Sequence, residues 1–275
     1  MAKKRYLTLA GIAVLVILLV LGIFLLVRLG RDDAPQASAT AADGAAYLAS
    51  LEQRDPGQVD QLLKEQRRQE FQQRREERLR QLESGEVSVW SLFEDYVLLG
   101  DSRAEGFDFY GYLSEDRCMA EMGAHIDSTD THLDQIKAMN PSMVFLCFGI
   151  NDMLMGVWST AEDYAAAYEQ VIRDIRQECP DAAIYINSII PALEWTSSYS
   201  QTSDILPDYN AALKALCDRT DRCYYVDNDA IAQANTDLYE SDGLHFVSDF
   251  YPIWATNMIM EVYDSEFETS EDPAA

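Results

Sequence analysis

The chain has 275 residues, and its formal net charge at pH 7 is −26. The charge is uneven, because residues 86–275 carry 8 Lys and Arg against 36 Asp and Glu, whereas residues 1–85 carry 13 against 11. A domain this acidic repels polyanions, which argues against nucleic acid as a partner. The five cysteines show no zinc-type spacing, so they predict no metal site, and pairing of Cys217 with Cys223 stays open.

The first predicted element is a membrane-spanning helix. Residues 6–27 form a run of 22 without a charge, and as a helix this run spans roughly 33 Å, enough for a ~30 Å hydrocarbon core. The basic residues 3–5 precede it, so the positive-inside rule places the N-terminus in the cytoplasm and the rest of the chain outside the cell. We expect residues 1–29 to be a single-pass cell-membrane anchor. A cleaved signal peptide with a site near residues 37–39 is the alternative, but the apolar run is longer than the usual ~7–15 residues.

A linker and a charged helix come next. Residues 30–54 are poor in large apolar side chains and predict a flexible linker. Residues 55–85 predict a helix, because Asp55 and Pro56 form a typical helix start and Gly85 a typical helix stop. The apolar residues of this helix are too sparse for a strong heptad seam, so we expect a charged stalk in solvent. A weak homodimer through the stalk is the alternative.

Residues 86–265 predict one α/β domain. Apolar segments alternate here with helical patterns, and this alternation predicts a mainly parallel sheet with helices on both faces. The predicted strands cover residues 96–100, 118–122, 142–149, 182–190 and 223–227, and the last helices cover residues 208–218 and 248–263. We expect the acidic residues 266–275 to be a disordered tail.

Four polar residues stand where loops leave one edge of this predicted sheet. Ser102 follows the first predicted strand, Asn151 follows the strand 142–149, and Asp242 and His245 precede the last helix. A serine hydroxyl is a weak nucleophile at neutral pH and needs a base, which in turn needs a group that orients it. His245 can be that base, Asp242 can hold its other ring nitrogen, and the Asn151 amide and the Ser102 N–H can stabilise an oxyanion.

The motifs around these residues resemble those of the SGNH/GDSL hydrolase family. The resemblance covers about residues 95–263 and rests on three blocks: Gly100-Asp101-Ser102 with Gly106, Gly149-Ile150-Asn151-Asp152, and Asp242-Gly243-Leu244-His245. It implies a flavodoxin-like three-layer α/β/α fold and ester hydrolysis or acyl transfer without a metal or other cofactor.

The resemblance also implies roles for single residues. Ser102 is the expected nucleophile, His245 the base and Asp242 its partner, while Asn151 is an expected oxyanion donor. The second block of the family supplies a further backbone donor, for which Gly123 is the candidate. A plain turn at Gly123 is the alternative, because the second glycine usual in that block is absent.

These observations predict an extracellular serine esterase. The expected substrates are acyl esters, acetyl esters in particular, on small molecules, carbohydrate or cell-wall polymers. Two alternatives use the same serine: an O-acetyltransferase, and a hydrolase of lipid esters or thioesters. A non-catalytic surface scaffold, with the charged helix as its interaction element, is the alternative outside this chemistry.

Overall fold

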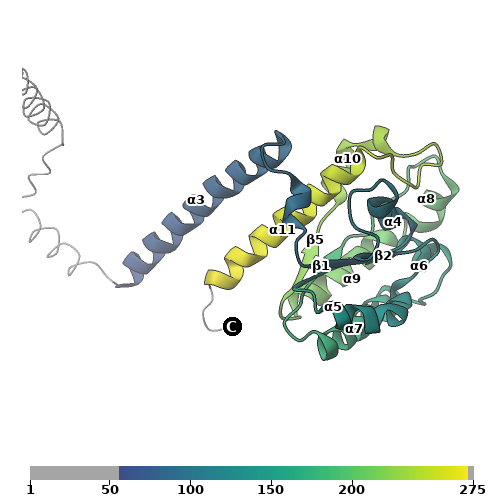
Figure 1. Ribbon diagram of the computed structural model, residues 1–275, viewed down its shortest axis with the longest axis horizontal. Coiled ribbons are helices and arrows are strands. Elements are labelled where there is room, and N and C mark those ends of the chain that lie inside the picture. Colours follow the sequence, from purple (N-terminus) through teal and green to yellow (C-terminus); the bar gives the residue numbers. More distant parts are fainter. Residues whose placement is uncertain (1–55, 272–275) are drawn as a thin grey trace, which may run out of the picture. The chain divides into compact units, whose positions relative to one another are not determined.

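The computed structural model describes residues 56–271, and its centre is a five-stranded parallel sheet (Figure 1). The strand order is β2-β1-β3-β4-β5, which is the flavodoxin-like doubly wound order. The strands are β1 Tyr96–Gly100, β2 Cys118–Ala120, β3 Met143–Cys147, β4 Ala183–Asn187 and β5 Cys223–Val226. The predicted α/β fold with a parallel sheet is therefore confirmed.

Helices cover both faces of the sheet because successive strand residues point in opposite directions. On one face, Leu98 and Phe145 join a buried cluster with α4 and α11, and on the other, Val97 and Val144 join a cluster with α7 and α9. Figure 1 shows these two helical layers on either side of the strands. The α-helices are α3 Pro56–Glu83, α4 Ser102–Phe109, α5 Leu133–Met139, α6 Ile150–Leu154, α7 Ala161–Glu178, α8 Ser197–Thr202, α9 Leu206–Asp218, α10 Asp229–Ala234 and α11 Phe250–Glu271, and the 3-10 helices are η1 Val89–Leu92, η2 Ile126–His132 and η3 Thr236–Leu238.

The second half of α3 packs against α11 instead of standing in solvent. Phe71 is 8% exposed, and its ring stacks on Phe267 with the centroids 3.9 Å apart. Arg75 Nε also donates to Asp264, with Nε 2.8 Å from Oδ1 and 2.9 Å from Oδ2. The expectation of a solvated stalk over residues 55–85 is therefore wrong for this half of the helix.

The same contacts correct the predicted C-terminal tail. Helix α11 continues to Glu271, beyond the expected domain end at residue 265. The extension is held by packing, because Phe267 stacks on Phe71, and Ser265 is buried with its hydroxyl 3.0 Å from the hydroxyl of Tyr185. Residues 266–271 are therefore helical and not a disordered tail.

The predicted anchor and linker, residues 1–29 and 30–54, lie outside the described residues. Within residues 56–271, no helix combines the length and the apolar character needed to cross a membrane.

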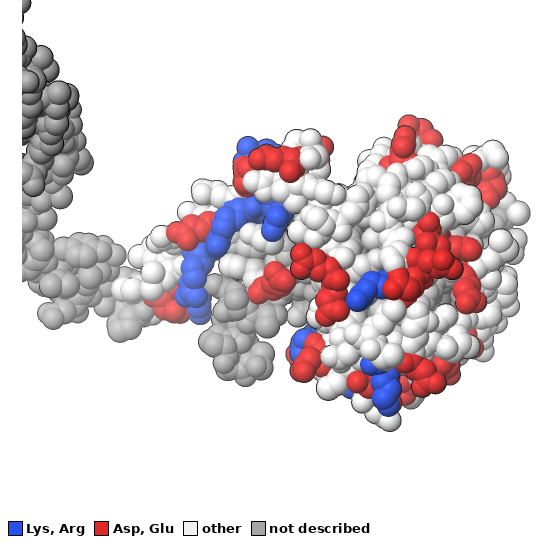
Figure 2. Space-filling view, viewed as in Figure 1, with Lys and Arg blue, Asp and Glu red and all other residues white. Residues whose placement is uncertain are grey.

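The five cysteines are buried and unpaired, and the Sγ atoms of Cys217 and Cys223 are 3.5 Å apart. Figure 2 shows acidic side chains spread over the visible face of the α/β domain, and a narrow run of basic side chains beside α3 and α11.

The packing of α3 on α11 makes Phe71 important for stability. We expect Phe71→Ala to lower the free energy of unfolding by roughly 2–4 kcal/mol, because it removes a buried ring from a stacked pair at the edge of the core. Chemical denaturation of the full chain measures this change. Leu62 lies on the same helix but is 52% exposed, so Leu62→Ala is the matched control, with an expected change below about 0.5 kcal/mol. Equal effects of the two variants would contradict the packing role of Phe71.

Candidate active site

Ser102 is the first residue of α4, directly after the end of β1. Asp101 caps this helix, and its Oδ1 accepts a hydrogen bond from the backbone N–H of Arg103 at 3.0 Å. Because Ser102 opens the helix, its own N–H has no acceptor within the helix. A side chain at Gly100 would place its Cβ 2.4 Å from Ala104 Cβ and 2.7 Å from Cys147 O, so only glycine lets α4 and β3 approach β1 this closely.

A hydrogen-bonded chain runs from Ser102 through His245 to Asp242. Ser102 Oγ lies 2.9 Å from His245 Nε2, and His245 Nδ1 lies 2.7 Å from Asp242 Oδ2. The other carboxylate oxygen of Asp242 accepts from the backbone N–H groups of Leu244 and His245, at 2.9 and 3.0 Å. With the proton of a neutral imidazole on Nδ1, Nε2 is free to accept the hydroxyl proton of the serine.

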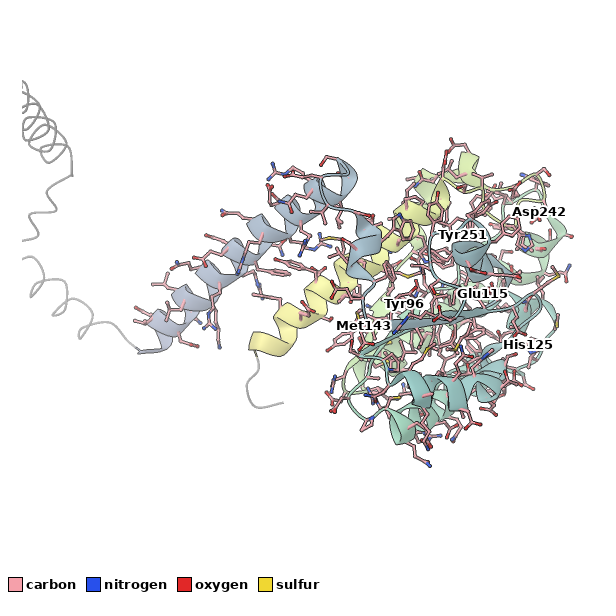
Figure 3. All side chains as sticks on the ribbon, viewed as in Figure 1. Tyr96, Glu115, His125, Met143, Asp242 and Tyr251 are labelled. Atoms are coloured by element: carbon pink, nitrogen blue, oxygen red, sulfur yellow. The ribbon has the colours of Figure 1, made fainter. Side chains whose placement is uncertain are left out.

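Asp242 is held as a carboxylate. Partial burial by itself raises the pKa of this group, but the hydrogen bonds from the His245 side chain and from the backbone of His245 and Leu244 outweigh that effect, so the pKa lies below its ordinary value. A carboxylate beside Nδ1 stabilises the imidazolium that forms when His245 accepts a proton. Figure 3 shows Asp242 and His125 at the same end of the domain, away from Met143 at the start of β3.

Asn151 lies in the first turn of α6, directly after β3. Its side-chain Nδ2 donates to Ala124 O at 3.1 Å, which commits one of the two amide N–H groups and leaves the other for a ligand. The turn into α6 needs glycine, because Gly149 has a φ of +138° and a Cβ there would lie 2.4 Å from Ile189 Cγ1 and 2.6 Å from the Tyr164 hydroxyl.

Gly123 lies in the loop after β2, next to the Ala124 carbonyl that Asn151 binds. Its φ is +78°, and Ala124 N donates to Glu121 O at 3.2 Å, so Gly123 is part of a tight turn. A Cβ at Gly123 would meet nothing within 4 Å, so the glycine is needed for its backbone conformation and not for space. Its role as an oxyanion donor remains a prediction.

Asp152 is a residue of this site that the sequence interpretation did not use. Its side chain is fully buried, and Oδ1 accepts from Trp158 Nε1 at 2.7 Å and from Ile126 N at 3.3 Å. Asn151 and Asp152 therefore hold the two ends of the segment 124–126, next to Gly123. Burial raises the pKa of Asp152 to about 6, against the opposing effect of these two hydrogen bonds.

A buried ion pair lies behind the serine. Arg103 Nε is 3.7 Å from Asp101 Oδ1, and the two side chains are 5% and 1% exposed. Burial raises the pKa of Asp101, although the guanidinium of Arg103 opposes this shift. Arg103 Nη1 also donates to Ile190 O at 2.6 Å, and this bond connects the serine helix to the loop after β4.

Gly106 of the first block is explained by packing. A Cβ at Gly106 would lie 1.8 Å from the Tyr251 hydroxyl, and that hydroxyl donates to Arg103 O at 2.9 Å. Tyr251 itself is 2% exposed and belongs to the core. Gly106 therefore lets α11 pack closely against the helix that begins at the serine.

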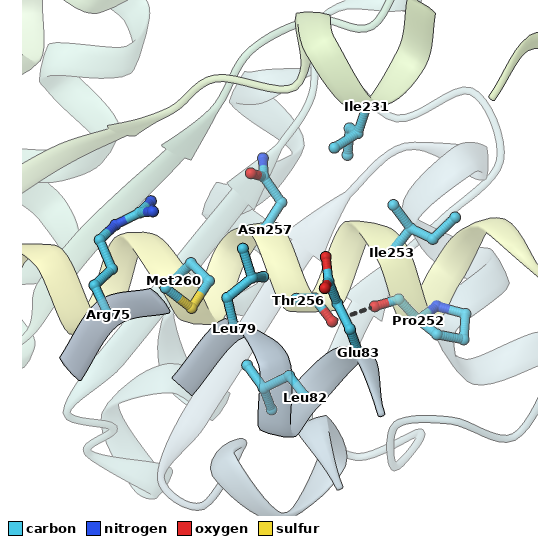
Figure 4. A pocket seen from close by; sticks show the side chains of 10 residues that line it. All are labelled: Arg75, Leu79, Leu82, Glu83, Ile231, Pro252, Ile253, Thr256, Asn257 and Met260. Carbon is cyan, nitrogen blue, oxygen red and sulfur yellow. Dashed lines mark hydrogen bonds between the residues drawn. The ribbon is translucent and has the colours of Figure 1, made fainter. Parts of the chain in front are cut away.

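A separate cavity of about 490 Å³ lies between the second half of α3, α10 and α11 (Figure 4). Its lining includes Leu79, Ile231, Asn257 and Met260, and none of the predicted site residues.

Within residues 56–271, no cluster of three or more His, Cys, Asp and Glu side chains is placed to hold a metal ion. The polar residues at the edge of the sheet are the candidate site because the hydrogen-bonded chain of Ser102, His245 and Asp242 lies there.

The buried carboxyl of Asp152 predicts a pH-dependent contribution to stability. Because its folded-state pKa of about 6 lies above the ordinary value of 3.8, the folded chain binds this proton more tightly than the unfolded chain does. The resulting stabilisation is fully present below pH 3.8 and is lost as the pH rises through 6. Asn at this position keeps an acceptor for Ile126 and Trp158 but does not titrate.

We therefore expect the free energy of unfolding of Asp152→Asn to rise relative to the natural chain as the pH increases from about 4 to 7. The expected relative gain is on the order of 1–3 kcal/mol. Denaturation curves of both proteins at several pH values measure it, and the subtraction cancels the other titrating groups. A constant difference between the two proteins across this range would contradict the raised pKa.

Comparison with known proteins places the chain in a family. The sequence pattern of the GDSL-like Lipase/Acylhydrolase family matches residues 98–251. A search of curated proteins returned no match. Among solved structures, a putative GDSL-like lipase from Parabacteroides merdae is 13% identical with a TM-score of 0.50, over 61% of this chain and 95% of that one. This likeness shows a shared fold.

Two further solved structures are similar at lower TM-scores. The C-terminal catalytic domain of a Streptococcus pneumoniae peptidoglycan O-acetyltransferase is 16% identical over 65% of this chain and 95% of that one, with a TM-score of 0.45. A Clostridium thermocellum family 3 carbohydrate esterase is 18% identical over 62% and 97%, with a TM-score of 0.46. The family match covers more than half of the chain, and the chain therefore belongs to the GDSL-like lipase/acylhydrolase family of serine hydrolases that act on ester bonds.

Proposed function

We propose that the protein is an extracellular serine esterase that removes acyl groups, acetyl in particular, from carbohydrate or cell-wall polymers. The observation that carries the proposal is the hydrogen-bonded chain of Ser102, His245 and Asp242, with lengths of 2.9 and 2.7 Å. These lengths are within the range at which a base accepts a proton from a nucleophile and an orienting group holds that base.

In the proposed reaction, Ser102 Oγ attacks the ester carbonyl carbon while His245 Nε2 accepts the hydroxyl proton. A tetrahedral intermediate forms, and the imidazolium of His245 returns the proton to the alcohol oxygen as the carbon–oxygen bond breaks. The acyl group is then on Ser102. A water molecule, deprotonated by His245, attacks the acyl-serine. As the bond between the acyl carbon and Ser102 Oγ breaks, the imidazolium of His245 returns the proton to Oγ and the carboxylic acid leaves.

Three donors are proposed for the oxyanion of the intermediate: the Ser102 N–H, the free amide N–H of Asn151, and the Gly123 N–H. Support for Asn151 comes from its bond to Ala124 O at 3.1 Å, which fixes the amide before substrate binds. Donors that are fixed in advance stabilise developing charge without reorganisation during the reaction.

The charge of the domain supports a neutral substrate. Residues 86–275 carry 8 basic and 36 acidic side chains, which repel anionic lipid surfaces and polyanions. A neutral acylated carbohydrate fits this charge better than an anionic phospholipid does.

The apolar run at residues 6–27, with basic residues before it, supports a membrane-anchored protein with its catalytic domain outside the cell.

An O-acetyltransferase is the second proposal for the same serine. The side chain of His245 is 38% exposed and that of Asp242 51%, so an acceptor alcohol has access to the base. Transfer would follow the same steps, except that His245 would deprotonate a sugar hydroxyl instead of water. Comparing acetyl release to water with acetyl transfer to an added sugar distinguishes the two activities.

Ser102→Ala is the first test of the proposed function. We expect the purified full chain to hydrolyse p-nitrophenyl acetate and to react with a fluorophosphonate, and we expect Ser102→Ala to lose the labelling and roughly 10⁴-fold or more of the kcat. Ser91→Ala is the control, since this exposed hydroxyl only donates to Ser88 O. Retention of full activity in Ser102→Ala would overturn the proposal.

Asn151→Ala tests the oxyanion donor. We expect kcat to fall by about 10²–10³ while KM stays within a few-fold, because the lost bond strengthens mainly in the transition state. Steady-state kinetics on p-nitrophenyl acetate measure both constants. Asn235→Ala is the matched control, because the Asn235 amide also donates to a backbone carbonyl, that of Ile231 at 2.8 Å. A rise in KM with unchanged kcat would identify Asn151 as a substrate-binding group instead.

A further inference from the structure

Trp195 is an aromatic side chain that the packing of the domain does not explain. It is 67% exposed, although a tryptophan gains more than most residues from burial. Two other aromatic residues near this edge of the sheet have evident structural roles, since Tyr251 is in the core and Trp158 Nε1 donates to Asp152 at 2.7 Å. An exposed indole beside a candidate site offers a ligand a flat apolar face together with a polar N–H.

The indole of Trp195 rests on the loop that holds the base. A Cβ at Gly243 would lie 2.8 Å from Trp195 Cζ2 and 3.1 Å from Cη2, so the six-membered ring lies directly over this glycine. Gly243 follows Asp242 and stands two positions before His245. The exposed indole therefore lies against the loop that carries Asp242 and His245.

The loop that carries Trp195 is held by hydrogen bonds to two other segments, the loop before His245 and the helix that begins at Ser102. Leu193 N donates to Gly243 O at 2.8 Å, and Thr196 N and Oγ1 both donate to Leu193 O, at 2.9 and 2.7 Å. At the start of the same loop, Ile190 O accepts from Arg103 at 2.6 Å. A platform held in this way binds a ligand without first having to be ordered.

The chemistry of ester cleavage decides which part of a substrate lies beside Trp195. In the proposed mechanism, His245 returns its proton to the alcohol oxygen, so the alcohol part lies on the side of His245 and of Trp195. The carbonyl oxygen of the acyl part lies toward the oxyanion donors.

We propose that Trp195 is the platform that binds the alcohol part of the substrate, and that this part is a sugar ring. The proposal rests on the proposed esterase function and names its specificity residue. One face of a pyranose carries several C–H groups and packs flat on an indole, while the ring hydroxyls stay in water. An alcohol without a ring, such as methanol, covers almost none of this surface.

The test compares two acetyl esters that differ only in the alcohol, methyl acetate and a mono-O-acetylated methyl glucopyranoside. For Trp195→Ala in the full chain, we expect the KM for the sugar ester to rise about tenfold with kcat within twofold. The kcat/KM for methyl acetate should stay within twofold. Trp195→Phe, which keeps an aromatic face, should recover most of the loss.

Phe109→Ala is the matched control. Phe109 is also an exposed aromatic, at 76%, but it lies at the end of α4 opposite to Ser102. We expect this variant to leave both substrates unchanged. The fluorophosphonate labelling rate of Ser102 should be the same in all variants, which shows that the nucleophile and its base remain intact.

Three results would overturn the proposal. Equal losses on both esters would assign Trp195 to support of the His245 loop, and no loss on either would remove it from the site. A changed preference between methyl butyrate and methyl acetate would place Trp195 on the acyl side. Failure of the esterase function itself is distinguishable, because it would appear as activity that persists in Ser102→Ala.

Discussion

The candidate site depends on how closely β1 and β3 approach where they end. The two strands are parallel neighbours, and Gly100 is in register with Cys147. Because Gly100 has no side chain, α4 begins at once on the carboxyl edge of the sheet, and Gly149 allows the same at the end of β3. A side chain at Gly100 would collide with α4 and β3, and one at Gly149 would collide with Tyr164 of α7 and with Ile189 in the loop after β4. The geometry of the site follows from these two glycines.

The residues behind the site are unusually polar for a protein interior. Asp101, Arg103 and Asp152 are all nearly or fully buried, and within the described residues Asp101 Oδ2, Arg103 Nε and Asp152 Oδ2 have no hydrogen-bond partner. Burying such groups lowers stability compared with apolar residues of the same size. In exchange, each group holds a loop: Asp101 caps the serine helix, Arg103 binds the loop after β4, and Asp152 binds the loop after β2. Rigid loops keep catalytic groups aligned before a substrate arrives.

Much of the fold could be predicted from local sequence patterns. The apolar run that ends at Gly100 predicted β1, and the similar run before Gly149 predicted β3, although β3 ends two residues earlier, at Cys147, because the chain turns toward α6. Short motifs also located Ser102, Asn151, Asp242 and His245, which the structure brings to one edge. These signals are local, because a strand end and the turn after it are encoded by adjacent residues.

The features that were missed depend on contacts between distant residues. The pairing of Phe71 with Phe267 joins the highly charged helix α3 to the acidic end of α11, and the local sequence of neither segment predicts that its phenylalanine packs against the other helix. Asp152 has the local pattern of a turn residue, and only the position of Ile126 shows that it holds a second loop. Trp195 and Tyr251 are both aromatic, and the sequence does not predict which of them is buried. In the structure Trp195 is exposed and Tyr251 is in the core. Exposure of a single aromatic is decided by tertiary packing.

The position of Trp195 also bears on the choice between hydrolysis and transfer. The alcohol that leaves in the first step and an alcohol that attacks in the second occupy the same place beside His245, because the second step reverses the path of the first. A platform that binds the leaving sugar therefore also binds an acceptor sugar. His245 is 38% exposed, so water reaches the base whenever this place is empty. An acceptor bound beside His245 replaces that water and has the advantage of a fixed orientation. If Trp195 binds the sugar as proposed, the exposed base favours hydrolysis while water fills this place, and transfer occurs only while an acceptor sugar covers Trp195.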